Sequence, residues 1–591
     1  IAEARTLPAA RLCYATGKRK REKGTSMKVV IVGGVAGGAT AAARLRRLDE
    51  AAEIVVFERS GYISYANCGL PYYIGGTIAD KSALTLQTPE SFRARFNVDM
   101  RVRHEVEAID AARHVVTVRN LETDEVFEEP YDKLILSPGA RPTRPALPGV
   151  GLDRLFTLRT VEDTFAMREF IDAESPRSAV VCGGGFIGLE VAENLRELGL
   201  DVTIVQRPRH LMNPFDADAA ALIHQEMRAH GVHLALGRSV EGFEERDGGI
   251  DVLVAGEEPL RADMVVLAIG VTPDTTLAET AGLETGIKGS IVVNDRMETG
   301  VEDIYAVGDA VQISHLVTGD DALISLAGPA NKQGRIAADN ISGRDSRFDG
   351  SQGTSILRVF DMTVAATGLN ERAAEAAGYR FDKVVTFSPS HATYYPGASN
   401  MTIKTVFERG SGRILGAQIV GFEGADKRID VLAAAVRGQM GAADLAELEL
   451  AYAPPFSSAK DPVNMAGFVI GNLLDGTVRQ FHWNDVPGVQ HNPEVTLLDT
   501  RTPGEYRRGH IKGAVHIPLD ELRARLEELD KGKPVYVHCQ SGLRSYIACR
   551  ILTGHGFTCY NLSGGYRLYE QVMREAAFDS RPAHPCGVPL T

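Results

Sequence analysis

The order of apolar and polar residues along the chain repeats one unit twice. In each copy a short, continuous apolar run leads into a cluster of glycines, and a helix-forming segment rich in alanine or leucine follows. The first copy begins with the run 29–32 (VVIV) and continues into the segment 39–48, and the second begins with 179–182 (AVVC). Such runs predict buried parallel strands, and the strand–turn–helix order predicts βαβ units. A fold of the α/β class is therefore expected.

The glycine-rich turns have the spacing of dinucleotide-binding turns. A turn of this kind brings the backbone close to a pyrophosphate at the N-terminus of the following helix. In the first copy, aligned on Gly33 and Gly38, the middle glycine position holds Val35. The next strand ends at Glu58, 20 residues after Gly38, where an acidic residue binds an adenosine ribose. One imperfect match is a weak signal, but two copies in the same context are a strong one.

The second copy contains all three glycines of the motif within residues 183–188. The strand after its helix, 202–205, ends at Gln206 and Arg207. A neutral residue at this position does not select strongly for NAD, and Arg207 could bind a 2′-phosphate. Both NADH and NADPH therefore remain open.

Two further segments extend the pattern. Residues 133–140 (KLILSPGA) predict a strand that crosses back between the nucleotide domains, and residues 304–310 (IYAVGDA) predict a strand that ends in Gly-Asp. This order resembles the glutathione-reductase-like pyridine nucleotide–disulfide oxidoreductases, from residue 27 to about residue 475. The resemblance implies a bound FAD whose ribityl chain meets Asp309. The residues that it implies for the FAD site are Gly33, Gly34, Val35, Ala36, Gly38, Glu58, Ser137, Pro138, Gly139, Gly308 and Asp309. It implies NAD(P)H at Gly183, Gly185, Ile187, Gly188, Gln206 and Arg207.

A single cysteine stands where this family usually has a pair. Cys68 lies in the segment 64–72 (SYANCGLPY), and the next cysteine, Cys182, is inside the second nucleotide strand. Cys68 therefore needs an oxygen-derived sulfenic acid or an external thiol as its redox partner; an inert buried thiol is the alternative. The segment resembles the single-cysteine subgroup of coenzyme A-disulfide reductases, NADH oxidases and peroxidases, and NADH-dependent persulfide reductases.

Two downstream segments resemble the coenzyme A branch of that subgroup, 391–397 (HATYYPG) and 452–462 (YAPPFSSAKDP). The resemblance implies a homodimer in which Tyr394 and Tyr452 lie near Cys68 of the other subunit, where a phenol can donate a proton to a leaving thiolate. The alternative is that Tyr394 and Tyr452 are core or interface residues whose hydroxyls have hydrogen-bond partners and no catalytic role. The resemblance also places coenzyme A at Thr40, Arg44, Arg47, Ser64, Asn67 and Lys460. Arg44 and Arg47 share a helix face. The alternative to a coenzyme A site is that this face only contacts solvent.

After Leu474 the pattern changes. A strand over 534–537 leads into 538–545 (HCQSGLRS), and the region from about 490 to 575 resembles a rhodanese-type sulfurtransferase domain. Backbone N–H groups around a cysteine between strand and helix favour an anion. Arg544 adds a positive charge, and both effects would hold a persulfide or thiosulfate at Cys539. A Cys-x5-Arg phosphatase loop is the alternative, but the loop here is one residue shorter.

We expect two Rossmann-like dinucleotide-binding domains, an α+β dimerisation domain and a C-terminal α/β rhodanese domain. Residues 1–26 begin with Ile1, hold seven Lys or Arg and two Glu, and predict a disordered leader; a targeting peptide is the alternative. The expected divisions are 1–26 for the leader, 27–148 with 271–345 for FAD, 149–270 for NAD(P)H, 346–475 for dimerisation, 476–492 for a linker, 493–575 for the rhodanese domain and 576–591 for a tail.

Composition limits the partners. A formal charge of −13 argues against a nucleic-acid-binding protein. The sequence contains no run of about 18 apolar residues, so we expect no transmembrane helix. Seven cysteines are too few, and odd in number, for a disulfide-built secreted protein. We therefore expect a cytoplasmic enzyme without a metal site, acting on small sulfur compounds.

The expected activity is FAD-dependent reduction by NAD(P)H of coenzyme A persulfide, polysulfide or coenzyme A disulfide through Cys68, with Cys539 handling sulfane sulfur. The fused rhodanese domain favours persulfide and polysulfide over coenzyme A disulfide. Three alternatives stay open: an NADH oxidase or peroxidase that uses a Cys68 sulfenic acid, a coenzyme A-disulfide reductase whose rhodanese domain takes no part, and a sulfur carrier with a regulatory flavin half.

Overall fold

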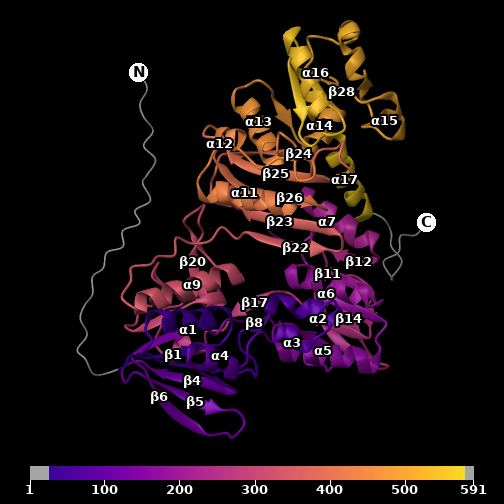
Figure 1. Ribbon diagram of the computed structural model, residues 1–591. Helices are drawn as coiled ribbons and strands as arrows, with labels where there is room; N and C mark the ends of the chain where they lie inside the picture. The colour runs from indigo at the N-terminus through magenta and orange to yellow at the C-terminus, as the bar shows by residue number, and fades with distance from the viewer. Residues whose placement is uncertain (1–25, 580–591) are drawn as a thin grey trace, which may run out of the picture.

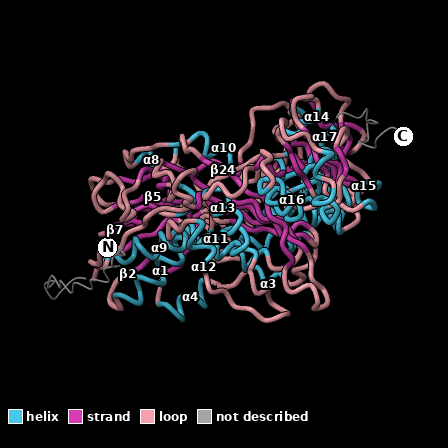
Figure 2. Tube along the Cα trace, turned by 90° about the horizontal axis from the view of Figure 1, so that it is seen from above, coloured by secondary structure: helices cyan, strands magenta, loops and turns pink. Residues whose placement is uncertain are grey.

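The computed structural model describes residues 26–579, and it has the expected mixed α/β architecture of four modules (Figure 1). The segment 1–25, which holds nearly all of the expected leader, lies outside the described residues, as do residues 580–591. Seen from above, α14, α15, α16 and α17 lie together at one end of the molecule (Figure 2). Within residues 26–579, no helix is long and apolar enough to cross a membrane.

The first nucleotide-binding module is a five-stranded parallel sheet in the order β19-β7-β1-β2-β3. Its strands are β1 (Lys28–Val32), β2 (Glu53–Glu58), β3 (Asp99–Val102), β7 (Lys133–Leu136) and β19 (Ile304–Ala306). On this sheet lie α1 (Ala36–Leu48), α9 (Ala327–Ile341), α4 (Pro89–Phe96) and an antiparallel layer of β4 (His104–Asp110), β5 (Val115–Asn120) and β6 (Val126–Pro130). α1 packs against α9, so the first glycine turn is held between sheet and helix.

The second module is a similar five-stranded parallel sheet in the order β12-β11-β10-β16-β9, but its edge strand β9 comes first in the chain, whereas β19 comes last in the first sheet. Its strands are β9 (Leu155–Thr157), β10 (Ser178–Cys182), β11 (Asp201–Gln206), β12 (Val232–Leu236) and β16 (Met264–Leu267). Its helices are α5 (Val161–Glu174), α6 (Phe186–Glu197) and α7 (Ala217–Ala229), and its small sheet is β13 (Val240–Arg246), β14 (Gly249–Val254) and β15 (Leu260–Ala262). The two chain crossings between the modules, β8 (Ala140–Pro142) and β17 (Val271–Pro273), pair antiparallel.

The third module is an antiparallel sheet in the order β22-β23-β26-β25-β24. Its strands are β22 (Ser355–Val359), β23 (Met362–Gly368), β24 (Phe381–Pro389), β25 (Asn400–Glu408) and β26 (Ile414–Gly421). Every residue of β26 is buried, because helices cover both faces. The covering helices are α11 (Ala425–Arg437), α13 (Pro462–Leu474) and α7 of the second module, with α10 (Glu371–Ala376) and α12 (Ala442–Glu447) at the ends.

The fourth module is a parallel sheet in the order β27-β31-β30-β28-β29. Its strands are β27 (Gln480–Phe481), β28 (Thr496–Asp499), β29 (Val515–His516), β30 (Val535–His538) and β31 (Cys559–Leu562). Its helices are α14 (Val486–Gln490), α15 (Pro503–Arg508), α16 (Leu543–Gly554) and α17 (Gly565–Asp579). The prediction that residues 476–492 form a linker is wrong. β27 pairs with β31, and the side chains of Phe481 and Val486 belong to the core of this module. α17 also continues through the first residues of the expected tail.

α17 fastens the fourth module to the second. The Glu575 carboxylate accepts a hydrogen bond from the Nδ1 of His224 at 3.0 Å and forms an ion pair with Arg228, both on α7. An apolar cluster of Ala221, Val385, Leu568 and Val572 joins three modules beside these charges. These contacts hold the fourth module in a defined position against the second module of the same chain.

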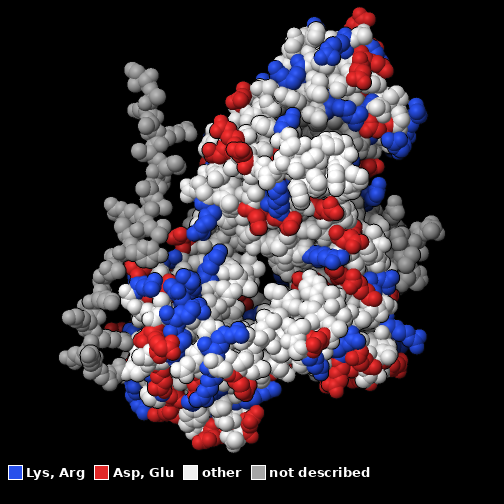
Figure 3. Space-filling model, viewed as in Figure 1, with Lys and Arg blue, Asp and Glu red and all other residues white. Residues whose placement is uncertain are grey.

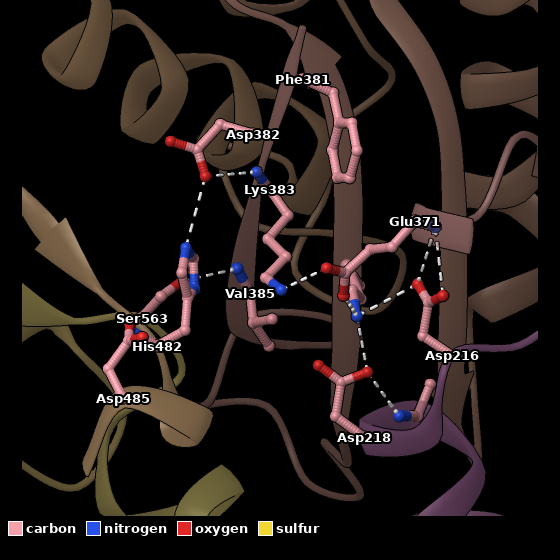
Figure 4. Close-up of polar contacts among 12 residues, drawn as sticks. Asp216, Asp218, Glu371, Phe381, Asp382, Lys383, Val385, His482, Asp485 and Ser563 are labelled. Carbon is pink, nitrogen blue, oxygen red and sulfur yellow. Dashed lines mark hydrogen bonds and ion pairs between the residues drawn. The ribbon is translucent and has the colours of Figure 1, made fainter. Parts of the chain in front are cut away.

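A buried group of charges joins the second and third modules. The side chains of Asp216, Asp218 and Glu371 converge (Figure 4), and the Lys404 ammonium lies among them, 3.1 Å from Asp216 and 2.6 Å from Asp218. Lys404 also pairs with Glu371. Three carboxylates could hold a metal ion, but here Lys404, together with Lys383 at Glu371, supplies the positive charge.

Candidate active site

One cavity of about 1690 Å³ connects the two nucleotide-binding modules. Its volume exceeds that of a pocket for a drug-sized ligand. The residues that line it include the expected site residues Gly33, Val35, Ala36, Glu58, Cys68, Ser137, Pro138, Gly139, Gly308 and Asp309 of the first module and Gly185 and Ile187 of the second. The structure therefore brings most of the predicted FAD site, two of the six predicted NAD(P)H residues and the candidate cysteine to a single space.

The first glycine turn fits a pyrophosphate. Gly33 has φ +94°, and a Cβ there would lie 2.1 Å from the Ser137 carbonyl oxygen, so only glycine can make this turn. Val35 has φ −106°, which any residue adopts, so the missing middle glycine leaves the turn intact. No side chain caps the N-terminus of α1, which leaves its first N–H groups available to phosphate oxygens.

Glu58 lies at the ribose end of this turn. It is buried at the end of β2, and one carboxylate oxygen accepts a hydrogen bond from Gly34 N at 2.8 Å. The second oxygen accepts from Ser60 N at 2.9 Å. The carboxylate is thus fixed where an adenosine ribose is expected, and the residues present fit FAD.

Arg159 lines the cavity, and no sequence motif identifies it as a site residue. Its guanidinium pairs with Asp309 at 2.8 Å and donates to the Ala140 carbonyl at 3.2 Å. The Asn67 amide accepts from Arg159 Nη1 at 3.0 Å and donates to the Arg159 carbonyl at 3.1 Å. Arg159 therefore ties the Gly-Asp segment to the turn that carries Cys68.

Cys68 lies in the short helical turn Asn67–Gly69, with its side chain open to the cavity. Its surroundings desolvate the thiol and raise its pKa; the Glu190 carboxylate raises it further and Arg159 opposes both. Burial, and then Glu193, raises the pKa of Glu190 itself to about 7. The Tyr72 hydroxyl donates to Glu190 at 3.5 Å. Glu190 was missed, although its position two residues after the last motif glycine was a usable signal.

The second glycine turn matches the first. Gly183 has φ +113°, with a would-be Cβ 2.3 Å from the Ala268 carbonyl oxygen. Gln206, at the end of β11, is buried and accepts from Gly184 N at 2.9 Å. The side chain of Arg207 is exposed. Of the remaining predicted residues, Gly188 packs its backbone against Gly183, where a Cβ would lie 2.0 Å from the carbonyl oxygen.

Four of the six residues expected at a coenzyme A site line the cavity: Thr40, Arg47, Ser64 and Asn67. Arg44, the fifth residue expected at this site, instead forms an ion pair with Asp339 of α9 at 2.7 Å. Lys460 is exposed and lies outside this lining. Lys and Arg side chains gather over α1 and α9 (Figure 3), and the exposed cations of these helices are Arg47, Lys332 and Arg335.

Tyr394 and Tyr452 lie together on the surface of the third module. Their hydroxyls are 2.9 Å apart, and the two residues are 73% and 47% exposed. Neither lines the cavity that contains Cys68 of the same chain. Nearby in sequence, Tyr395 and Phe456 are exposed as well.

The Cys539 loop is closed around the sulfur. Cys539 is fully buried, and its Sγ accepts hydrogen bonds from Gly542 N at 3.1 Å and Ser545 Oγ at 3.3 Å. The first turn of α17 braces the loop, since Tyr566 N donates to the Cys539 carbonyl at 2.8 Å. Burial lowers the pKa of the adjacent His538 to about 4, so this imidazole is neutral.

Arg544 differs from the expectation of an uncompensated positive charge. Its two terminal nitrogens donate to the Glu505 carboxylate at 2.8 and 2.7 Å. This pairing, supported by hydrogen bonds from Thr502, lowers the pKa of Glu505 to about 2. Glu505 was not predicted as a site residue; it lies in the segment before β29, far from the loop in sequence.

Two dinucleotide-binding modules that share a cavity with an exposed thiol define a nucleotide-dependent oxidoreductase of disulfide chemistry. The family models agree: pyridine nucleotide-disulphide oxidoreductase matches residues 27–334, its dimerisation domain matches 354–462, and a rhodanese-like domain matches 485–571. The chain belongs to the pyridine nucleotide–disulphide oxidoreductase family and is an enzyme with a fused rhodanese-like domain. The predicted fold class is thereby confirmed, and the family implies FAD and NAD(P)H.

Several relatives share most of this chain. Coenzyme A disulfide reductase of Staphylococcus aureus is 38% identical over 442 residues, 75% of this chain and 99% of the relative. The crystal structure of reduced Bacillus anthracis CoADR-RHD has a TM-score of 0.91 at 46% identity and covers 94% of this chain and 99% of its own. The NAD-dependent persulfide reductase from A. fulgidus has a TM-score of 0.86 at 37% identity, covering 92% and 100%. Water-forming NADH oxidase from Lactobacillus brevis has a TM-score of 0.73 at 29% identity, covering 76% and 100%.

Proposed function

We propose that this enzyme uses NAD(P)H and FAD to reduce coenzyme A persulfide, polysulfide or coenzyme A disulfide at Cys68. The observation that carries the proposal is the position of Cys68. It opens into the cavity between the two dinucleotide turns, and it is the one cysteine among the described residues that line this cavity. A thiol without a protein partner is free to exchange with an external sulfur compound.

The chemistry that FAD supplies when bound is two-electron transfer between a nicotinamide nucleotide and a sulfur centre. The chain's own contribution at that end is binding: Gly33, the N-terminus of α1 and Glu58 hold the pyrophosphate and ribose, and Asp309, paired with Arg159, meets the ribityl chain. The second turn, through Gly185 and Ile187, holds the nicotinamide nucleotide against the same cavity.

Cys68 is the nucleophile. Its thiolate attacks the sulfane sulfur of coenzyme A persulfide and releases coenzyme A, or attacks coenzyme A disulfide and leaves a mixed disulfide. The net reaction consumes NAD(P)H and a proton and, from a persulfide, yields the thiol and sulfide. Arg159 favours the thiolate, whereas burial and Glu190 oppose it.

Coenzyme A is anionic, and cations are available on α1 and α9. Arg47 of α1 lines the cavity, and Lys332 and Arg335 of α9 are exposed. Thr40, Ser64 and Asn67 offer hydrogen bonds nearby. We propose that these groups hold the phosphates of coenzyme A, while Arg44 fixes α1 on α9 through Asp339.

We propose a homodimer in which Tyr394, Tyr452 and Lys460 serve the partner's site. The match to a dimerisation domain supports the association, and the exposure of both tyrosines on that domain leaves them for a second copy to cover. A phenol beside Cys68 of the other subunit would protonate the departing thiolate.

We propose that Cys539 accepts or supplies the sulfane sulfur. Gly542 N and Ser545 Oγ already donate hydrogen bonds to its sulfur, and such donors stabilise a persulfide anion. The rhodanese-like match and the defined position of this module against α7 support its taking part in the reaction.

The test compares Cys68→Ser, Cys539→Ser and the unchanged protein with coenzyme A persulfide, coenzyme A disulfide and oxygen as acceptors of NAD(P)H electrons. We expect Cys68→Ser to lose the reduction of both sulfur substrates. Retention of that turnover would refute the proposal, and a faster rate with oxygen than with either sulfur compound would favour the activity of the Lactobacillus brevis relative. Bound coenzyme A, or its adduct on Cys68, in mass spectra of the purified protein is a second expected result.

A further inference from the structure

The two arginines at the Cys539 pocket are both neutralised by carboxylates of their own. Arg544 makes a bidentate pair with Glu505. Arg501, which donates to the Gln540 side chain at 3.2 Å, is buried and paired with Asp499 at 2.7 Å. The loop residues 540–543 between Cys539 and Arg544 carry no charge. Among residues 26–579, each arginine identified at this pocket thus has a carboxylate partner, and Arg544 also lies within hydrogen-bond reach of the Cys539 sulfur.

Glu505 cannot easily leave this pair. It is the third residue of α15, and its Oε2 accepts hydrogen bonds from Thr502 N at 2.9 Å and Thr502 Oγ1 at 2.8 Å. The capping box fixes the side chain on its own helix. Its pKa of about 2, set first by Arg544, keeps the carboxylate ionised at every physiological pH.

From this arrangement we infer that Glu505 is a specificity-determining residue that makes the Cys539 pocket select persulfides of organic thiols over thiosulfate. The inference rests on the proposed role of Cys539 in sulfane-sulfur transfer. Thiosulfate is a dianion whose sulfonate oxygens need a free cation. To reach Arg544 it must break two charge-assisted hydrogen bonds or lie beside the Glu505 carboxylate, and like charges in contact are strongly unfavourable.

A thiol persulfide makes no such demand. The ionisable group at its reacting end is the sulfur that is transferred, and any other charge of the donor is on R. Gly542 N and Ser545 Oγ already donate to the sulfur of Cys539. The helix that follows the loop also carries exposed apolar side chains. Leu543, in the loop segment before Arg544, and Ile547, one turn further along α16, are 60% and 39% exposed. Residues with this spacing share one helix face, which gives an alkyl chain an apolar surface.

The transfer balances without an outside reductant. The Cys539 thiolate attacks the outer sulfur of R–S–SH, the S–S bond breaks, and R–SH leaves with the proton. Cys539 then carries the persulfide anion. With thiosulfate the same attack releases sulfite. Sulfite leaves as an anion, and its negative charge must form beside the Glu505 carboxylate.

The test measures single-turnover loading of one sulfur atom onto Cys539, by quenched-flow and peptide mass spectrometry, in Cys68→Ser protein without NAD(P)H. Glutathione persulfide and thiosulfate are the donors. At equal concentration we expect loading from the persulfide to be at least about tenfold faster, which is a modest like-charge penalty. In Glu505→Gln, we expect loading from thiosulfate to rise about tenfold and loading from the persulfide to stay within about twofold. Glutamine preserves the capping box.

The control is Glu521→Gln, which removes a carboxylate from the same module in an exposed pair with Arg525 and is expected to change neither rate. Equal loading from both donors in the Cys68→Ser protein, or a Glu505→Gln change that affects both donors alike, would overturn the inference; the first result needs no variant at Glu505. Sulfur loading elsewhere after Cys539→Ser would instead refute the proposed role of Cys539.

Discussion

Glu58 and Gln206 occupy the same position in the two nucleotide-binding modules, and each accepts the N–H of the second glycine in its turn. The Glu58 carboxylate accepts from Gly34 at 2.8 Å, and the Gln206 amide accepts from Gly184 at 2.9 Å. The geometry is conserved between the copies while the charge is not. A carboxylate at this place repels a ribose 2′-phosphate, and an amide does not.

We therefore expect the enzyme to accept NADPH, with Arg207 as the cation for the 2′-phosphate. Gln206→Glu should keep the turn, because glutamate can accept the same hydrogen bond, and should lower kcat/KM for NADPH relative to NADH by about tenfold or more. Arg207→Ala should lower the same ratio. Steady-state kinetics with both nucleotides measure it, with Lys288→Ala, an exposed cation of the first module, as control. An unchanged ratio in Gln206→Glu would show that the ribose lies elsewhere.

Glu190 should make the reactivity of Cys68 depend on pH near neutrality. Its pKa is raised to about 7, so its charge appears as the pH rises through that value, and the charge raises the pKa of the Cys68 thiol. Glu190→Gln removes this opposition, so the pH profile of Cys68 alkylation by iodoacetamide should move to lower pH. At pH 7 the alkylation rate should rise severalfold.

Glu197→Gln provides the matched control, because Glu197 is exposed at the end of the same helix. An identical alkylation profile in Glu190→Gln and in the unchanged protein would mean that Cys68 does not sense this carboxylate. Turnover alone would not separate the effect from damage to the nucleotide site, whereas the alkylation profile reports on the thiol itself.

The elements that the sequence predicts are those whose cause is local. Apolar runs such as 29–32 and 179–182 become β1 and β10, and the glycine turns need conformations that only glycine adopts. The pairs that set the charge of the sites join residues far apart in the chain: Arg159 with Asp309 is 150 positions apart and Arg44 with Asp339 is 295. No local pattern contains these pairs, because tertiary packing creates them.

The segment 476–492 shows the same limit for an element. Its polar, proline-containing sequence indicates a linker, yet β27 adds to the edge of the fourth sheet. A two-residue edge strand needs little apolar sequence of its own, since its partner β31 supplies the ladder. Likewise, Glu505 gives no motif of its own and becomes a pocket residue only where α15 meets the Cys539 loop.

Lys404 should be a large contributor to the stability of the junction between the second and third modules. Burial opposes the ionised form of Asp218, but the Lys404 charge outweighs it and lowers the pKa of that carboxyl. Lys404→Met would leave Asp216 and Asp218 without their cation, while Glu371 would keep its pair with Lys383 (Figure 4). Removing one partner from such a buried group is expected to destabilise the protein by about 3–5 kcal/mol.

Thermal unfolding measures this loss, with Lys427→Met as control, because Lys427 is a half-buried lysine of α11 that donates to the Ala451 carbonyl and has no part in this group of charges. Adding Asp218→Asn to Lys404→Met should recover part of the stability, because it removes one uncompensated charge. If the single variant melts like the unchanged protein, the two aspartates do not depend on Lys404, and protons or a bound cation must compensate them.

Tyr394 and Tyr452 allow the subunit arrangement to be tested through chemistry. The double variant Tyr394→Phe/Tyr452→Phe keeps both rings and removes the paired hydroxyls, and we expect it to reduce coenzyme A persulfide about 100-fold more slowly, as for loss of a general acid. Tyr395→Phe, a change at the exposed neighbour, should have little effect. A loss of dimer in gel filtration would point to a packing role instead.

A mixed dimer separates action on the partner from action within one chain. In a dimer of one double-Phe subunit and one Cys68→Ser subunit, purified with two affinity tags, the intact Cys68 belongs to one chain and the intact tyrosines to the other. If the tyrosines serve the partner's site, one of the two sites is complete, and about half of the wild-type rate should return. If they serve their own chain, each site lacks either the thiol or the hydroxyls, and the rate should stay at the level of the parent variants.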